Sequence, residues 1–250
     1  MNILTVIPKW IRTPIRDLLW KVKSIPYIGE GRLCPVCGSE SKKFRGFGYP
    51  KRQDAECVHC GALERHRFMW LFFQQQTDLF NGRTKRVLHV APERCFQPLL
   101  RKKLGNNYVT ADLFNPRADI KMDITDIKLD DESIDVIYCS HVLEHVNDDR
   151  KAMREFQRIL KKNGWAILLV PIFPGLTFED PAIVDPKERL RHYGQEDHVR
   201  RYGSDYVDRL VEAGFIVKVW TVNELFEKDD IEKMGLTPAS GEIYVCTKNQ

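Results

Sequence analysis

Four cysteines in two close pairs are the first residues along the chain whose types and spacing could do chemistry. The pairs are Cys34-Pro-Val-Cys37-Gly and Cys57-Val-His-Cys60-Gly, with 19 residues between them. In each pair, the glycine after the second cysteine relieves a tight turn that points two thiolates at one ion. Four thiolates favour tetrahedral Zn²⁺ in a closed site, which leaves no open position for a substrate. The spacing therefore predicts a zinc ribbon with a structural metal.

Two aspartates at the ends of apolar stretches form a second group of candidates. They are the last residues of Tyr108-Val-Thr-Ala-Asp112 and of Asp119-Ile-Lys-Met-Asp123. An acid at the carboxyl end of a strand accepts hydrogen bonds from ribose hydroxyls in nucleoside-binding α/β folds. A lone aspartate at a strand end is more often a turn former. The order of the surrounding elements favours ribose binding by Asp112.

A third group of polar side chains follows the apolar run Ile134–Cys139. It consists of Ser140, His141, Glu144 and His145. Histidine titrates near neutral pH and suits a general base, so His141, which is nearest the strand end, is predicted to be catalytic. Glu144 and His145 are predicted to contact substrate. The competing interpretation is that His141 packs under a ligand and that Glu144 and His145 only begin a helix.

The segment 176–202 is a long polar insertion that the sequence predicts to be a substrate lid. His198 with Asp197 is the rival general base within it. Arg189, Arg200 and Tyr202 are predicted to hold an anionic or polyhydroxylated acceptor. An ordinary charged surface loop is the alternative.

The elements that must position these residues alternate between strand and helix. The sequence predicts strands over 86–90, 108–112, 119–123, 134–139 and 165–170, a helix over 148–162 ended by Lys-Asn-Gly, a helix over 205–213, and strands over 215–220 and 242–247. Such alternation builds a parallel sheet, and ligands bind at the carboxyl ends of its strands. The predicted fold class is α/β, a Rossmann-like seven-stranded sheet with helices on both faces, plus a small N-terminal zinc ribbon.

Residues 86–247 resemble a class I S-adenosylmethionine-dependent methyltransferase of the broad type 11 kind. The resemblance depends on an acid after the second strand, an acid after the third, His141-Val-Leu-Glu-His145 after the fourth, and Arg158-Ile-Leu-Lys-Lys-Asn-Gly164 before the fifth. It implies S-adenosylmethionine as the cofactor. It also implies that Asp123 lies beside the adenine amino group, with Ile124 over the ring face. The cofactor-binding residues expected are His89, Ala91, Glu93, Asp112, Asp123, Ile124 and Ser140.

The first loop departs from the family pattern, in which glycines let the backbone pass close to the cofactor. Here the loop reads His89-Val-Ala-Pro-Glu93, without glycine. Ala91 is small enough for a close approach. Glu93 would either pair with the ammonium of the methionine moiety or repel its carboxylate. Pro98 implies that the first helix restarts near Gln97.

The predicted domains are an amphipathic N-terminal segment (1–30), the zinc ribbon (31–62), a connecting helix (63–84) and the methyltransferase domain (85–250). Within the first, residues 10–23 are basic, contain tryptophan and carry an apolar stripe. Such a helix packs on its own protein or makes peripheral contact with a membrane. At the start of the connecting helix, Glu64–Arg67 are expected to line the substrate entrance or to form surface ion pairs.

Composition and charge limit the alternatives. The chain has 43% hydrophobic and 30% charged residues, and no apolar run approaches the ~20 residues of a membrane span. The first residues lack a signal-peptide pattern, and the paired cysteines fit a reducing compartment, so a cytoplasmic protein is predicted, with peripheral membrane contact as an addition. Residues 1–85 carry 15 Lys and Arg against 7 Asp and Glu, which favours an anionic partner.

Three functions remain open at this point. The first is methyl transfer from S-adenosylmethionine to a small-molecule or glycan-like acceptor. The second is methylation of RNA, in which the ribbon, the basic N-terminus and the basic, aromatic loop 42–52 bind the nucleic acid. The third is a non-catalytic binding protein that has lost the use of the cofactor. Neither the acceptor nor the oligomeric state follows from the sequence.

Overall fold

The computed structural model describes residues 22, 24–48 and 50–248. The predicted amphipathic helix over 10–23 lies almost entirely outside these residues. Within them, no helix is long and apolar enough to cross a bilayer. The chain divides into two compact units, one formed by residues up to Gln76 together with Phe226–Ser240, and the other by Thr77–Leu225 with Gly241 onward.

The first unit holds the cysteines among short strands and two helices. Its described elements are η2 (Ile25–Tyr27), β1 (Arg32–Leu33), β2 (Glu40–Ser41), β3 (Arg45–Phe47), β4 (Arg52–Glu56), α2 (Glu64–Gln75), α8 (Lys228–Met234) and η5 (Pro238–Ser240). β1 pairs with β2 and β3 pairs with β4, both antiparallel. Its strands have at most five residues each, so side-chain cross-links add to the backbone pairing.

Arg67 supplies one such cross-link. Its guanidinium is fully buried and donates hydrogen bonds to the carbonyls of Ala55 and Ala62, and to those of Met234 and Gly235 far along the chain. It also lies 4.0 Å from the centre of the Phe44 ring. Arg67 is therefore not part of a substrate entrance or of a surface ion pair. It joins residues 226–240 to the cysteine-containing segment, whereas the sequence-based boundaries assigned 226–240 to the other domain.

The second unit is built on a seven-stranded mixed sheet with the order β10-β11-β9-β8-β5-β6-β7. The strands are β5 (Val87–Val90), β6 (Tyr108–Asp112), β7 (Ile120–Lys121), β8 (Ile134–Ser140), β9 (Leu160–Leu169), β10 (Phe215–Trp220) and β11 (Ile243–Lys248). Only β11 runs antiparallel to its neighbours. All four residues of β5 and six of the seven of β8 are buried, as expected for central parallel strands. The predicted seven-stranded fold is confirmed.

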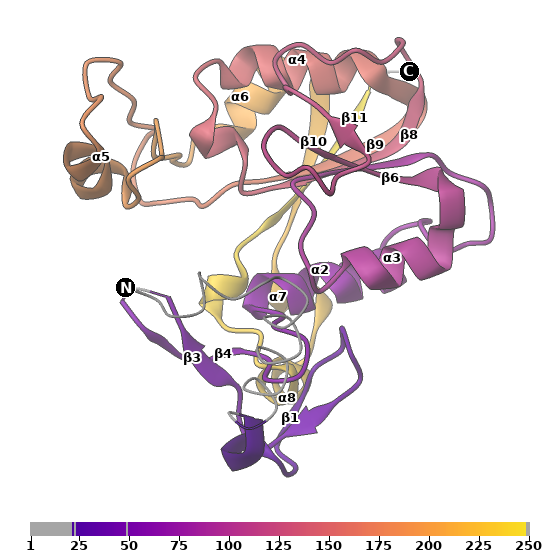
Figure 1. The fold of residues 1–250 in the computed structure, drawn as a ribbon, viewed down its shortest axis with the longest axis vertical. Coiled ribbons are helices and arrows are strands. Elements are labelled where there is room, and N and C mark those ends of the chain that lie inside the picture. Colours follow the sequence, from indigo (N-terminus) through magenta and orange to yellow (C-terminus); the bar gives the residue numbers. More distant parts are fainter. Residues whose placement is uncertain (1–21, 23, 49, 249–250) are drawn as a thin grey trace. The chain divides into compact units, whose positions relative to one another are not determined.

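Helices cover both faces of this sheet. Figure 1 shows α4 (Asp149–Ile159) and α6 (Tyr206–Glu212) on one face and α3 (Gln97–Leu104) on the other. α3 begins at Gln97 with Pro98 in its first turn, as predicted. The short helix α7 (Val222–Leu225) follows β10.

The junction of α4 and β9 differs from the prediction. The helix ends at Ile159, and Leu160–Leu169 is one continuous strand that includes the Lys-Asn-Gly predicted as a stop. The reason lies in tertiary packing. Leu160 is fully buried and pairs with Ile134, while a side chain at Gly164 would meet the carbonyl oxygen of Asp135 at 2.6 Å. The glycine permits close strand approach instead of ending the helix.

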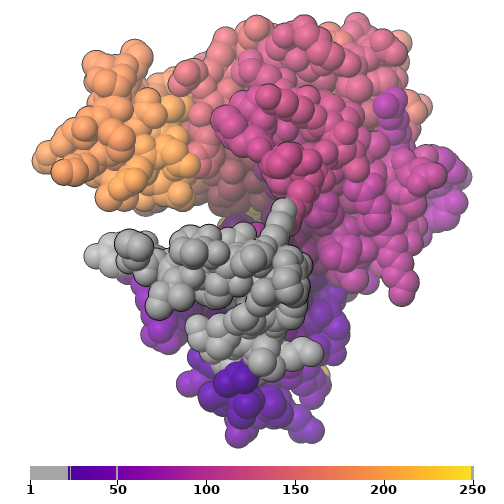
Figure 2. Space-filling view, in the orientation of Figure 1, coloured from indigo at the N-terminus to yellow at the C-terminus, as the bar shows by residue number. Residues whose placement is uncertain are grey.

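The insertion after β9 carries the helix α5 (Pro186–Tyr193) and forms a lobe beside the sheet, in orange in Figure 2. Two isolated bridges, Ile172 with Tyr202 and Phe178 with Arg201, close its base. The sheet order reverses between β5 and β8, because the chain moves outward on one side through β6 and β7 and then on the other through β8 and β9. Ligands bind at such a reversal in open α/β sheets.

Candidate functional site

A cavity of about 780 Å³ opens at the point where the sheet order reverses. Its walls come from the carboxyl ends of β5, β6, β7 and β8 and from the start of α4. This volume lies in the range of small-molecule sites, about 300–1,000 Å³. The lining residues are Val90, Ala91, Asp112, Leu113, Phe114, Met122, Asp123, Ile124, Thr125, His141, Val142, His145, Val146, Asn147, Asp148, Lys151 and Asp197.

Asp112 and Asp123 line this one cavity, although they end different strands. In each, the Oδ1 atom is occupied by the local turn. Asp112 Oδ1 accepts from the backbone N–H of Phe114 and Asn115, and Asp123 Oδ1 accepts from the N–H and hydroxyl of Thr125. The bonds from Thr125 lower the pKa of Asp123, so it is ionised near neutral pH. Among the described residues, neither Oδ2 atom has a hydrogen-bond partner, so one oxygen of each carboxylate is available to a ligand.

Ala91 carries the loop between β5 and α3 past the cavity in a left-handed conformation, with φ of 49°. Its N–H donates to the carbonyl of Ala111 on β6, which holds this turn against the sheet. The left-handed region disfavours any residue with a Cβ atom, and a following proline disfavours departure from extended backbone. The loop thus adopts a glycine-type conformation without a glycine, and the strain lies at a cavity wall.

Replacing Ala91 with glycine is expected to stabilise the ligand-free protein by about 1 kcal/mol, because the Cβ clash of the left-handed conformation disappears. Urea unfolding measures this change. Ala182→Gly is the matched control, since Ala182 is exposed and its φ is not positive. The control should lose stability through the greater freedom of the unfolded chain. Equal losses in both variants would show that Ala91 is not strained.

Glu93 does not enter the cavity lining, and its carboxylate is held toward the sheet. His89 Nε2 lies 2.5 Å from one oxygen and the Tyr138 hydroxyl donates to the other at 2.9 Å. The hydroxyl of Tyr108 lies 2.7 Å from His89 Nδ1. Burial, with the charge of Glu93 in addition, raises the pKa of both tyrosines. The structure therefore assigns His89 and Glu93 to a polar network below the loop, and their contact with cofactor stays a prediction.

The segment after β8 brings His141 to the cavity wall. His141 has φ of 55° and its Nδ1 lies 3.2 Å from Glu144 Oε1. Its Nε2 has no hydrogen-bond partner among the described residues. Ser140 and Glu144 are buried and do not line the cavity, whereas His145 does. His141 is thus the candidate base with direct access to the cavity.

The insertion contributes Asp197 to the same wall, but the other predicted lid residues lie elsewhere. His198 is only 3% exposed, and burial lowers its pKa. Arg189 lines a second cavity of about 570 Å³, which shares Asn147 and Asp148 with the first. Arg200 also borders that second cavity, while Tyr202 is fully buried.

Arg200 fixes the insertion to the segment after β8. Its guanidinium donates to the carbonyls of Leu143 and Val146, to that of Asn147 at 2.8 Å, and to Glu179 at 2.8 Å. Tyr202 donates to Asp149 at 2.6 Å. These bonds occupy both side chains within the protein, so the structure gives them positioning roles, and direct contact with an acceptor stays a prediction.

Glu179 accepts hydrogen bonds from Arg200 and Arg209, and this pairing makes the insertion sensitive to acid. Partial burial would raise the pKa of Glu179, but the bonds from Arg209 and Arg200 outweigh it and the pKa is lowered. A lowered carboxylate pKa stabilises the fold above the unfolded-state pKa of about 4.3, and that stabilisation is lost as pH falls through the folded-state pKa.

We therefore expect Glu179→Gln to lower the thermal midpoint at neutral pH, and the difference from the wild type to shrink as the pH falls through the lowered folded-state pKa of Glu179 and the carboxylate becomes protonated. Thermal unfolding followed across this pH range gives the result. Glu196→Gln, at an exposed position of the same insertion, is the control and should follow the wild type throughout. A constant difference between Glu179→Gln and wild type at every pH would contradict the ionic role.

Sequence reasoning missed several residues of the cavity wall. Phe114, close to Asp112, is 88% exposed. The sequence signal that could have identified it is the apolar pair Leu113-Phe114 directly after the acid that ends the strand. Asp148 lines both cavities and caps α4, its Oδ1 accepting from the N–H of Lys151 at 2.8 Å. Lys151, one helical turn later, is exposed on the same wall.

The four predicted cysteine ligands come together in the first unit. Their four sulfur atoms all lie within 4.8 Å of one another. The Sγ atoms of Cys34 and Cys60 are 3.7 Å apart, and those of Cys37 and Cys57 are 3.8 Å apart. A tetrahedron with Zn–S bonds of about 2.3 Å has S–S edges of about 3.8 Å, whereas a disulfide requires about 2.05 Å. Gly38 and Gly61 have φ of 72° and 75°, and each donates to the carbonyl of the first cysteine of its pair. The donor set and its dimensions therefore fit one zinc ion.

When the chain is compared with known protein families, the matching residues lie in the second unit. Residues 77–168 match the family described as "Methyltransferase domain". The chain is 30% identical over 121 residues to an uncharacterized methyltransferase of Bacillus subtilis, YcgJ, covering 47% of this chain and 46% of that protein. It is 29% identical over 99 residues to the malonyl-[acyl-carrier protein] O-methyltransferase of Nitrosospira multiformis, covering 39% of this chain and 30% of the relative.

The chain thus spans less than half the length of both curated relatives. Among solved structures, that of YcgJ from Bacillus subtilis matches with a TM-score of 0.49 and 16% identity, over 74% of this chain and all of that one.

Proposed function

We propose that this chain transfers a methyl group from S-adenosylmethionine to a small polar acceptor. The match of residues 77–168 to the family described as "Methyltransferase domain" supports the proposal. The observation that carries the proposal is that two strand-end carboxylates, Asp112 and Asp123, each offer a free oxygen to one nucleoside-sized cavity at the reversal of the sheet. The two alternative functions are RNA methylation and non-catalytic binding. Neither is supported by a site of comparable geometry among the described residues.

The cavity residues fit the cofactor. Asp112 would accept from the ribose hydroxyls, Asp123 from the adenine amino group, and the buried Ile124 would cover the ring. Val90 and Ala91 would border the methionine moiety. When bound, S-adenosylmethionine supplies a methyl group on a positively charged sulfur that any well-placed nucleophile can attack, so alignment is the main demand on the protein.

His141 would remove the proton from a hydroxyl or amine acceptor. When Nδ1 donates to Glu144, Nε2 is left with a free lone pair, which is the form a general base requires. The buried carboxylate also stabilises the imidazolium that forms, in the manner of an acid–histidine pair. His141 thus has the position for this role, and its contact with Glu144 permits the tautomer that the role requires.

The second cavity supports a small polar acceptor. It adjoins the first through Asn147 and Asp148 and is lined by charged side chains, among them Glu179, Asp180 and Arg189. Such a surface suits a polyhydroxylated or charged molecule, including a glycan.

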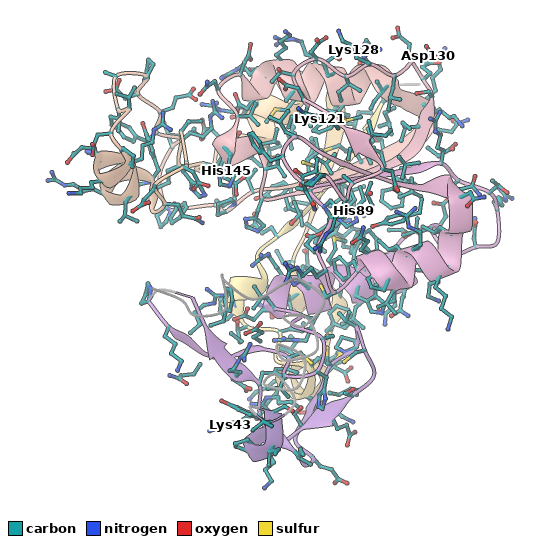
Figure 3. All side chains as sticks on the ribbon, in the orientation of Figure 1. Lys43, His89, Lys121, Lys128, Asp130 and His145 are labelled. Carbon is teal, nitrogen blue, oxygen red and sulfur yellow. The ribbon has the colours of Figure 1, made fainter. Side chains whose placement is uncertain are left out.

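The loop 42–52 gives less support to an RNA acceptor. Phe44 is buried, Arg45 pairs with Glu56, and Arg52 pairs with Glu64, so these groups stabilise the ribbon itself. Lys42, Lys43 and Lys51 are its exposed cations, and Figure 3 labels Lys43.

Thermal unfolding with S-adenosylhomocysteine, the product nucleoside, tests the proposal. At 100 times its dissociation constant, one bound ligand adds about 2.7 kcal/mol, which raises the midpoint of a domain of this size by about 5–11 °C. Adenine alone at the same concentration is the control. Absence of any shift with S-adenosylhomocysteine at millimolar concentration would contradict cofactor use and favour the non-catalytic binder.

A further inference from the structure

Three metal-ligating side chains meet beside the cavity, separate from the cysteine cluster. They are Glu144, His145 and His198, and one ligand atom of each lies within 4.8 Å of the other two. Glu144 and His145 belong to the short helix η4 (Leu143–His145) after β8, while His198 comes from the insertion. A hydrogen bond of 2.9 Å from the N–H of Val199 to the carbonyl of Glu144 holds the two segments together. The tertiary fold therefore creates this cluster.

Two of the three groups are buried without adequate partners. Glu144 is 1% exposed and His198 is 3% exposed. Glu144 Oε2 and both ring nitrogens of His198 are buried and make no hydrogen bond of normal geometry, although the backbone of Tyr193 lies close enough to His198 to act on its pKa. Buried polar atoms nearly always have a partner, because leaving one unpaired costs about 1–3 kcal/mol. Glu144 and His198 thus carry unpaired buried atoms within a group whose ligand atoms lie within 4.8 Å of one another, which indicates a missing ligand.

The surroundings resemble the outer shell of a metal site. Glu144 Oε1 lies 3.2 Å from His141 Nδ1, and His145 Nδ1 lies 3.3 Å from Asp197 Oδ2. The rings of His145 and His198 meet edge to face with centres 4.6 Å apart. In metalloproteins, carboxylates orient the ligating histidines and hydrogen bonds orient the ligating carboxylates. Both arrangements are present here.

We propose that Glu144, His145 and His198 bind one divalent transition-metal ion. Two imidazoles and one carboxylate suit Zn²⁺, Fe²⁺ or Mn²⁺, and three protein ligands leave at least one coordination position open. His145 and Asp197 line the cavity, so the open position is reached from there. Figure 3 shows His145 at the junction between the sheet and the insertion. This replaces the role of general base that the sequence suggested for His198.

The open coordination position of the metal ion indicates which class of acceptor could bind. This conclusion rests on the proposed methyl transfer. A hydroxyl oxygen of the acceptor would bind the ion, which favours loss of its proton. The proton passes to Nε2 of His141. The new bond joins this oxygen to the methyl carbon while the carbon–sulfur bond breaks, and the sulfur keeps the electron pair. The acceptor is therefore an oxygen nucleophile.

The test uses the full chain with zinc at the four cysteines, dialysed against a weak chelator until one zinc ion per chain remains so that the three-ligand site is empty, and then titrated with Co²⁺ by calorimetry. Zn²⁺ binds a given site more tightly than Co²⁺, so the cysteine zinc stays in place. We expect the wild type to bind one further ion per chain, and Glu144→Gln and His145→Gln each to weaken that binding by about 100-fold or more. His192→Gln, a histidine of the insertion outside the cluster, is the control and should bind as the wild type does.

No uptake of Co²⁺ by the wild type, or unchanged affinity in His145→Gln, would overturn the metal site. Because His145 is partly exposed, its replacement is less disruptive than that of the buried His198. Acetohydroxamate, which binds metals through two oxygens, should then change the visible absorption of the bound Co²⁺. An unchanged spectrum would overturn the open position.

Binding of S-adenosylhomocysteine, measured on the same samples, separates this inference from the proposed function. Binding of the nucleoside without Co²⁺ uptake overturns the metal site alone. Co²⁺ uptake without nucleoside binding overturns the methyltransferase proposal and leaves the metal site supported.

Discussion

Replacing Asp112 with asparagine is expected to weaken the binding of S-adenosylhomocysteine by about 100-fold or more. Each hydrogen bond to a charged group contributes about 1.5–3 kcal/mol, and in the proposed complex the free Oδ2 of Asp112 would accept two from a ribose. Asparagine has the same shape, and its Oδ1 can still accept from the N–H of Phe114 and Asn115. The loop after β6 should therefore survive. Isothermal titration calorimetry measures the affinity.

Asp130→Asn is the matched control for Asp112→Asn. Asp130 is exposed, lies outside the cavity lining and is labelled in Figure 3. Its replacement removes the same charge and should leave the affinity unchanged. If Asp112→Asn binds S-adenosylhomocysteine as tightly as the wild type does, the cavity is not the nucleoside site and the proposed function fails.

Replacing Cys34 with serine should have the second large effect, loss of the zinc ion and unfolding of the unit that holds it. Structural zinc contributes apparent binding energies of about 10–16 kcal/mol at neutral pH, more than the total stability of most domains. We expect zinc retained after dialysis against a weak chelator to fall from one ion per chain to nearly none. Calorimetric unfolding should lose the transition of the cysteine-containing unit.

Cys95→Ser controls for the chemical change, because Cys95 is also buried but lies outside the cluster. It should keep its zinc and both transitions. Full zinc content in Cys34→Ser would show that the four sulfurs are close for another reason. Affinity for S-adenosylhomocysteine provides an independent check that the other unit is still folded.

The parts of the fold that followed from sequence depend on local spacing. The two cysteine pairs each fold into a turn that needs only five residues, so their pattern is visible without tertiary information. The strand-end acids were likewise predictable, because the carboxyl ends of parallel strands meet at one edge of a sheet. Asp112 and Asp123 do line one cavity, and Glu93 does not occupy it.

The parts that could not be predicted depend on contacts between distant segments. Arg67 was interpreted as a surface or entrance residue from its neighbours, yet its partners include carbonyls at Met234 and Gly235. Arg200 was predicted to hold an acceptor because it lies in a polar insertion. That contact stays a prediction, whereas the bonds that Arg200 donates to carbonyls after β8 were not foreseen. An arginine with five donors can satisfy several backbone carbonyls in a buried position, and composition does not distinguish this use from ligand binding.

The return of residues 226–240 to the cysteine-containing unit has a consequence for how this protein can be divided. The polypeptide leaves the sheet after α7 and comes back to it at β11, so no single cut between Gln76 and Thr77 yields two whole bodies. A fragment that starts at Thr77 would retain a segment whose Met234 and Leu236 had lost their apolar surroundings. A fragment that holds the second unit alone would therefore need two deletions, of the residues up to Gln76 and of Phe226–Ser240, with Leu225 joined to Gly241.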